Sequence, residues 1–162
     1  GRKMDIIKGE YTMRCIDEYY ASSYHLSVEE LNNINAHLAS GLVKVDGLKK
    51  ESDRARFWCK DGFIIVMCHH QDCCEGVWIE DVDSEENNSD IYTDCKWCKL
   101  EEINSDNNPP LDKWDESYTW TFYKITTNKG YDTIRWYGTS NGYYSESVDF
   151  ELWQYKDCDL VE

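Results

Sequence analysis

Residues 67–82 read MCHHQDCCEGVWIEDV, and the rest of the chain is organised around them. Two histidines and three cysteines lie within seven positions of this stretch. The apolar run Phe63–Cys68 leads into it and is typical of a buried strand. Glu75–Val82 predicts a further strand, and most of the sequence that follows favours antiparallel sheet.

Strand signals flank this stretch on both sides. Within residues 54–60, Ala55, Phe57 and Cys59 alternate with the basic residues and Trp58. Asp61-Gly62 supplies a tight turn before Phe63, and together these features predict a hairpin. We expect a short strand over Leu42–Val45. Near the C-terminus, turn sequences separate three further predicted strands, which cover Tyr118–Thr127, Tyr131–Gly138 and Tyr143–Tyr155. On the last strand Val148, Phe150 and Leu152 share one face, and Asp149 and Glu151 share the other.

One helix is predicted before these strands. Ser27 and Glu30 form a capping box, because the serine can accept from the backbone near Glu30 and the glutamate can reach back. The apolar residues that follow have helical spacing, which predicts a helix over about 28–40 with Gly41 at its C-terminal end.

These signals predict one α+β domain over residues 1–162. Its expected core is a mainly antiparallel, twisted sheet with the N-terminal helix packed on it. We expect residues 1–50 to form a helical N-terminal portion and residues 51–162 an antiparallel β portion. Residues 5–25 are compatible with either a short strand or a helix, and residues 92–100 are ambiguous.

Charge is the strongest compositional feature. The chain carries 17 basic and 32 acidic residues, a formal net charge of −15. Fifteen of the acids but only three of the bases lie between Gln71 and Glu116. Such a surface repels nucleic acid and anionic membranes and attracts basic protein surfaces. Evenly spread acidity would serve only solubility.

A zinc site is one candidate for the chemistry. Cys95-Lys96-Trp97-Cys98 is a C-x-x-C sequence, which is half of a zinc-binding signature. Together with one histidine and one cysteine of the central stretch it could complete a tetrahedral site. The predicted ligands are His69, Cys73, Cys95 and Cys98. Buried free thiols within a sheet are the alternative interpretation.

Nucleophilic catalysis has weaker support. A cysteine beside a histidine suggests a thiol enzyme, but that chemistry needs a thiolate stabilised by positive charge. The neighbours of Cys73 and Cys74 are the acids Asp72 and Glu75. No phosphate-binding loop, nucleophile elbow or paired-histidine protease motif is present. We therefore expect a protein without enzymatic activity, and predict no catalytic residues and no required cofactor.

Aromatic residues are interleaved with the acids, and this pattern is typical of a protein-binding surface. Arginines of a partner would pair with the carboxylates. The predicted partner-binding residues are Asp81, Asp83, Glu85, Glu86, Asp90, Asp94, Glu101, Glu102, Trp78, Trp97 and Trp114.

Two longer motifs carry a family resemblance. His69–Val77 follows the pattern H-x-Q-D-C-C-E-x-V, and Ser140–Val148 follows S-N-G-Y-Y-S-E-x-V, with the W-x-F-Y sequence Trp120–Tyr123 between them. In these features the chain resembles an uncharacterised phage-encoded family without an established activity. The resemblance implies a viral origin and supplies no catalytic residues.

The resemblance and the charge together lead to three functional hypotheses. The first is a phage inhibitor, similar to anti-CRISPR proteins, that mimics nucleic acid and binds the basic surface of a host nuclease or other nucleic-acid-binding defence protein. The second is a zinc-stabilised accessory module or small hydrolase with its site around His69–Cys74. The third is a structural phage component.

The expected setting is the host cytoplasm. The sequence contains neither a signal peptide nor an apolar run long enough to span a membrane. The eight cysteines are irregularly spaced, so we expect mostly reduced thiols and at most one disulfide. We further expect Cys73 or Cys74 to be buried, because a strand would turn one of them inward.

Overall fold

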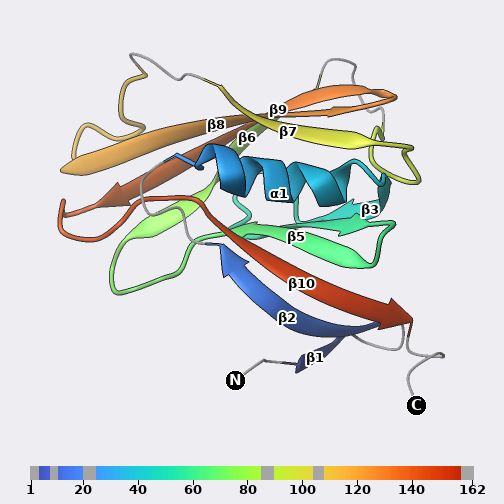
Figure 1. The fold of residues 1–162 in the computed structure, drawn as a ribbon. Coiled ribbons are helices and arrows are strands. Elements are labelled where there is room, and N and C mark those ends of the chain that lie inside the picture. The colour runs from blue at the N-terminus through green and yellow to red at the C-terminus, as the bar shows by residue number, and fades with distance from the viewer. Residues whose placement is uncertain (1–3, 8–10, 20–24, 85–89, 104–107, 158–162) are drawn as a thin grey trace.

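The computed structural model describes residues 4–7, 11–19, 25–84, 90–103 and 108–157. In this part of the chain one helix and two antiparallel sheets form an α+β fold, as the sequence predicts (Figure 1). The six strands of sheet A lie in the order β1 (Met4–Ile7), β2 (Tyr11–Tyr19), β10 (Asp149–Asp157), β5 (Phe63–Cys68), β4 (Ala55–Cys59) and β3 (Leu42–Asp46). The four strands of sheet B lie in the order β6 (Gly76–Ser84), β9 (Gly130–Ser140), β8 (Ser117–Thr127) and β7 (Cys98–Ile103).

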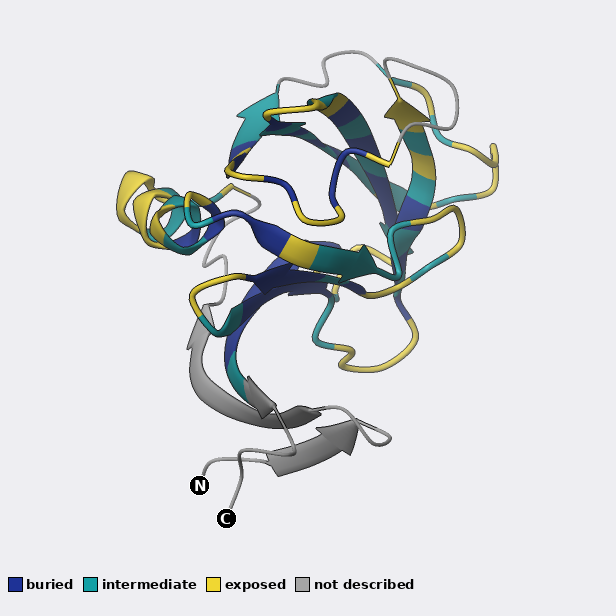
Figure 2. Cartoon of the chain, turned by 90° about the vertical axis from the view of Figure 1, so that its right-hand side faces the viewer, coloured by how far each residue is buried: buried dark blue, intermediate teal, exposed yellow. Residues whose placement is uncertain are grey.

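The helix α1 (Val28–Leu38) begins at the predicted capping box. The backbone N–H of Glu30 donates to Ser27 Oγ at 3.1 Å, and the Ser27 N–H donates to Glu30 Oε1 at 2.9 Å. The helix contacts β7 of sheet B and β4 and β5 of sheet A, so it covers one side of the space between the sheets. Ile34 and Leu38 are buried there, and the exposed face of the helix points outward (Figure 2).

The main core lies between the two sheets. Sheet A contributes Phe57, Ile65, Met67, Phe150 and Leu152, and sheet B contributes Ile79, Leu100, Ile125, Ile134 and Trp136. The predicted alternation on the last strand is confirmed, because its apolar residues face this core and its acids lie on the opposite face of sheet A. We call the faces turned away from the core the outer faces of the two sheets.

A β-bulge in β6 keeps the acids out of the core. Val77 and Ile79 point inward, but the next apolar residue of the strand is Val82, which is out of phase with a period of two. The pairing with β9 shifts register between Ile79 and Asp81, so Glu80 is the extra residue. After the bulge Val82 faces inward again, and Asp81 and Asp83 stay on the outer face of sheet B.

The hairpin β4–β5 and the strand β3 are confirmed, and the largest differences from the sequence prediction concern the end of the helix, the start of the last strand and the content of residues 1–50. The helix ends at Leu38 with Ala39 as its C-cap, before the predicted end. The last strand starts at Asp149, because residues 141–148 follow an irregular path on which Glu146 is buried and accepts from Thr119 Oγ1 at 2.7 Å. Residues 1–50 are not only helical, since β1, β2 and β3 lie within them.

No helix in the described ranges has both the length and the apolar character that a bilayer crossing requires.

Gly41 allows a close approach between the end of α1 and the chain before β7. Its φ is +91°, and an added Cβ would lie 2.4 Å from the carbonyl oxygen of Cys95. Gly142 has a similar φ of +93°, but there the nearest heavy atom to an added Cβ is 3.9 Å away. The two glycines therefore share the backbone requirement and differ in the space around them.

We predict that Gly41→Ala destabilises the fold more than Gly142→Ala. The left-handed conformation costs each variant about 1–2 kcal/mol. The clash with the Cys95 carbonyl adds about 1–3 kcal/mol to Gly41→Ala alone. Urea unfolding of both variants measures the difference, and equal losses of stability would contradict the close approach.

Candidate functional site

The central stretch crosses from sheet A to sheet B as the loop 69–75, and the buried carboxylate of Glu75 fixes this loop. His69 Nε2 lies 2.8 Å from Glu75 Oε2, and the backbone N–H groups of Asp72 and Cys73 donate to the same carboxylate at 3.1 and 2.8 Å. Gln71 Nε2 also donates to the carbonyl oxygen of Glu75. These contacts organise a tight loop in place of a strand.

His69 belongs to this network through both ring nitrogens. Its Nδ1 lies 2.7 Å from the carbonyl oxygen of Ser147, which is on the segment that crosses back from β9 to β10. The side chains of His69 and Glu75 are 3 % and 0 % exposed. His69 is therefore a structural link between the two crossings, and its nitrogens are engaged in protein contacts.

The predicted zinc ligands are not brought together. Cys73 is exposed and forms a disulfide with Cys74, so the expectation that one of these two cysteines is buried is wrong. Cys73 and Cys74 are exposed because residues 69–75 form a loop and not a strand. The backbone of this loop faces Glu75, and the two cysteine side chains point into solvent. Cys95 and Cys98 are buried free thiols in the core below α1. Burial raises the pKa of the Cys98 thiol to about 12.

The predicted partner-binding acids are divided among several places. Asp81 and Asp83 lie on the outer face of sheet B, where Asp81 Oδ2 is 2.6 Å from Arg135 Nη1 and Asp83 Oδ2 is 3.4 Å from Arg135 Nη2. Glu101 on β7 shares this face, opposite Lys124, and lies 3.8 Å from Lys99. This part of the face therefore carries mixed charge.

The remaining predicted acids lie elsewhere. Glu102 points to the other side of β7, where it accepts from the Leu26 N–H at 2.6 Å and contacts His25. Asp94 pairs with Lys60 at 2.8 Å, and Asp90 accepts from the backbone N–H groups of Tyr92 and Thr93. Glu85 and Glu86 lie outside the described residues.

The predicted aromatic residues lie at opposite ends of sheet B. Trp78 is half-buried on the outer face, whereas Trp114 is 77 % exposed in the loop 108–116 before β8. Trp97 is also exposed, but it precedes β7 at the end of the sheet where β8 finishes. Trp78 and the loop that carries Trp114 therefore belong to one surface, because this loop is hydrogen-bonded to Tyr137 beside Trp78, and Trp97 is separate from it.

Tyr137 is the centre of that surface, and the sequence prediction did not include it. The rings of Trp78, Trp120 and Tyr118 lie 5.5, 4.9 and 6.2 Å from its ring. The loop 108–116 covers Tyr137, whose hydroxyl donates to the Asp115 carboxylate and accepts from the Leu111 N–H. The alternation of aromatic residues along β8 was the available signal for this surface.

A groove lies beside Trp78 at β6, which is an edge strand of sheet B. The loop 47–54 covers this edge, because the N–H of Glu51 donates to the Ile79 carbonyl and the N–H of Ile79 donates to the Ser52 carbonyl, both at 2.7 Å. The groove has a volume of about 580 Å³. Its lining includes Lys50, Glu51, Asp53, Gln71, Trp78 and Glu80. We call it the β6 groove.

The β6 groove suits a cationic side chain. Glu51, Asp53 and Glu80 supply three carboxylates against one lysine, which lies 3.8 Å from Glu80. Trp78 donates from Nε1 to Glu80 Oε2 at 2.8 Å, so its ring is held in the groove wall. A guanidinium can pair with such carboxylates and also stack on an indole ring.

Comparison with known proteins gives a family and no function. Residues 28–150 match a family described as "Domain of unknown function (DUF7448)". No curated protein and no solved structure matches the chain.

The lowered pKa of Glu75 makes the stability of the fold depend on pH in the acidic range. Burial by itself raises its pKa, but the hydrogen bonds from His69 and from the backbone of Cys73 and Asp72 outweigh this effect and lower the pKa to about 2. A group with a lowered pKa stabilises the folded state above its unfolded pKa, here about 4.5. That contribution disappears as the pH falls from about 4.5 to 2.

We predict that Glu75→Gln lowers the free energy of unfolding at pH 7 by on the order of 3 kcal/mol, the free energy that corresponds to this pKa difference. The variant should also lose the steep part of the pH dependence between about pH 4.5 and 2. Denaturant unfolding across this range measures both effects. Glu116→Gln removes an exposed carboxylate and controls for the change in net charge; an identical profile for both variants would contradict the role of Glu75.

Proposed function

This chain belongs to the DUF7448 family, and we propose that it is an acidic binding protein that docks onto a basic surface of a partner protein. The β6 groove carries this proposal. It combines three carboxylates with an indole wall at the edge of a sheet, and this combination fits an arginine side chain better than an anionic or apolar ligand.

The surrounding surface supports the same conclusion. Asp81 and Asp83 continue along β6 from the groove, and the two carboxylates share one arginine, Arg135. Leu111 and Tyr118 add exposed apolar area next to Tyr137, and Trp114 is exposed on the same loop as Leu111. An interface with aromatic anchors beside acidic groups is suited to a basic protein surface.

The net charge of −15 favours a partner surface that otherwise holds nucleic acid. Such surfaces carry clustered lysines and arginines that neutralise phosphates. The resemblance to a phage-encoded family makes a host defence protein, such as a nuclease, the expected partner. In this proposal the chain inhibits the partner by occupying its nucleic-acid-binding surface.

Charge reversal in the β6 groove tests the proposal. We predict that Glu51→Lys combined with Asp53→Lys weakens partner binding at least tenfold. Each exposed ion pair contributes about 0.2–1 kcal/mol to binding. The double reversal replaces two attractions with two repulsions, so its total effect reaches the roughly 1.4 kcal/mol that corresponds to a tenfold change in affinity. The partner is captured from lysate of susceptible bacteria, purified, and titrated by calorimetry at two salt concentrations.

Glu29→Lys combined with Asp94→Lys makes the same change in net charge away from the groove and should leave affinity nearly unchanged. Double-stranded and single-stranded oligonucleotides should each be tested as competitors, and one of them should displace the chain. Equal weakening by the two double variants would show that the groove has no special role. A partner that holds nucleic acid and the chain together, without mutual weakening, would rule out mimicry.

A further inference from the structure

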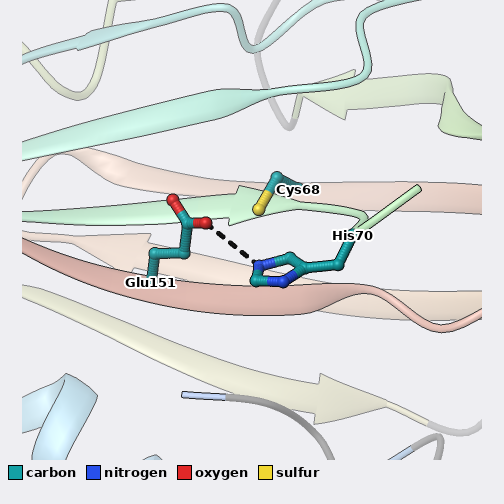
Figure 3. A group of neighbouring side chains, drawn as sticks. All are labelled: Cys68, His70 and Glu151. Atoms are coloured by element: carbon teal, nitrogen blue, oxygen red, sulfur yellow. Dashed lines mark ion pairs between the residues drawn. The ribbon is translucent and has the colours of Figure 1, made fainter. Parts of the chain in front are cut away.

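The outer face of sheet A carries a second group of chemically active side chains. Cys68 is the last residue of β5, and Glu151 lies on the neighbouring strand β10. Cys68 pairs with Asp149 in the register, so Cys68 and Glu151 are diagonal neighbours on one face. His70, two residues after β5, turns its ring toward both of them (Figure 3).

The donor atoms of these three residues converge. One ligand atom from each of Cys68, His70 and Glu151 lies within 4.8 Å of the other two. His70 Nε2 is 3.0 Å from Glu151 Oε2. Zinc bonds of about 2.0–2.3 Å in tetrahedral geometry place ligand atoms roughly 3.3–3.6 Å apart. Small side-chain shifts would therefore bring all three donors to bonding distance from one ion.

Hydrogen bonds from neighbouring groups hold the side chains of His70 and Glu151 in place. Metal ligands in proteins are commonly oriented by hydrogen bonds of this kind. Glu151 Oε1 accepts from Arg54 Nη2 at 3.1 Å and from Trp153 Nε1 at 3.0 Å, which leaves Oε2 directed at His70. The backbone N–H of His70 donates to Asp149 Oδ2 at 2.9 Å. The carboxylate that anchors His70 thus comes from the strand that also carries Glu151.

We infer that Cys68, His70 and Glu151 form a binding site for a divalent transition metal of the zinc class. A thiolate, an imidazole and a carboxylate are donors that zinc and cobalt(II) accept together. Three protein ligands leave a fourth position for water or another ligand. This site shares no residue with the lining of the β6 groove and does not depend on the proposed function.

The charge balance favours a cation over a reactive thiol. Cys68 is buried next to the carboxylates of Glu151 and Asp149, and the cation beside them, Arg54, is paired with Glu151. A bound dication would offset the negative charge of a thiolate and of Glu151. The His70 side chain is 29 % exposed, so the site lies close to the protein surface.

Cobalt(II) titration of the purified chain tests the inference, because thiolate ligation produces a near-ultraviolet charge-transfer band. We predict that one equivalent binds, that the band appears, and that zinc(II) displaces the cobalt. Cys68→Ser should abolish the band. His70→Ala and Glu151→Gln should each weaken binding at least about tenfold, since even the loss of an outer partner costs 10–100-fold.

Matched variants distinguish this site from the other thiols. Cys98→Ser and the pair Cys73→Ser with Cys74→Ser should keep both the band and the affinity. Circular dichroism confirms that each variant is folded, and zinc should raise the melting temperature of the wild type but not of Glu151→Gln. Absence of binding at micromolar cobalt, or binding that survives both Cys68→Ser and His70→Ala, would overturn the inference.

Discussion

The buried carboxylate of Glu75 is the constraint on which the arrangement of the two sheets depends. The chain leaves sheet A after β5 and enters sheet B at β6, and Glu75 satisfies two backbone N–H groups of the loop between them. His69 connects this carboxylate to Ser147 in the segment that returns to sheet A. A buried N–H without an acceptor costs about 1–3 kcal/mol. The position of sheet B over sheet A is thus tied to one acid and its partners.

Local sequence patterns predicted much of the fold. The capping box at Ser27, the hairpin β4–β5 and the alternation from Val148 to Leu152 each need only neighbouring residues, and each is found in the structure. The division into two sheets depends on pairing between distant residues, which periodicity does not specify. The bulge at Glu80 was visible as a break in alternation between Ile79 and Val82, although a break alone does not distinguish a bulge from the end of a strand.

The candidate sites were harder to predict, because they depend on which charges meet in space. A count of acids does not show that Asp81 and Asp83 face Arg135 or that Glu102 turns toward Leu26. The sequence drew attention to the cysteines and histidines of this stretch, but the predicted ligands His69 and Cys73 do not lie beside Cys95 and Cys98. His69 is engaged by Glu75, whereas Cys68 meets a glutamate more than eighty residues further along the chain. Cys68 and Glu151 come together only because β5 pairs with β10.

The strand order of sheet A also has a consequence for synthesis on the ribosome. β10 lies between β2 and β5, so a strand that is made after all the other described strands occupies an interior position of the sheet. Until it emerges, β5 has a neighbour on one side only, and β2 lacks the partner that connects it to the rest of the sheet. The hairpins β4–β5 and β8–β9 can form earlier, because their strands are close in sequence. Completion of sheet A must therefore wait until residues 149–157 have been made, and a chain truncated before them would expose open strand edges.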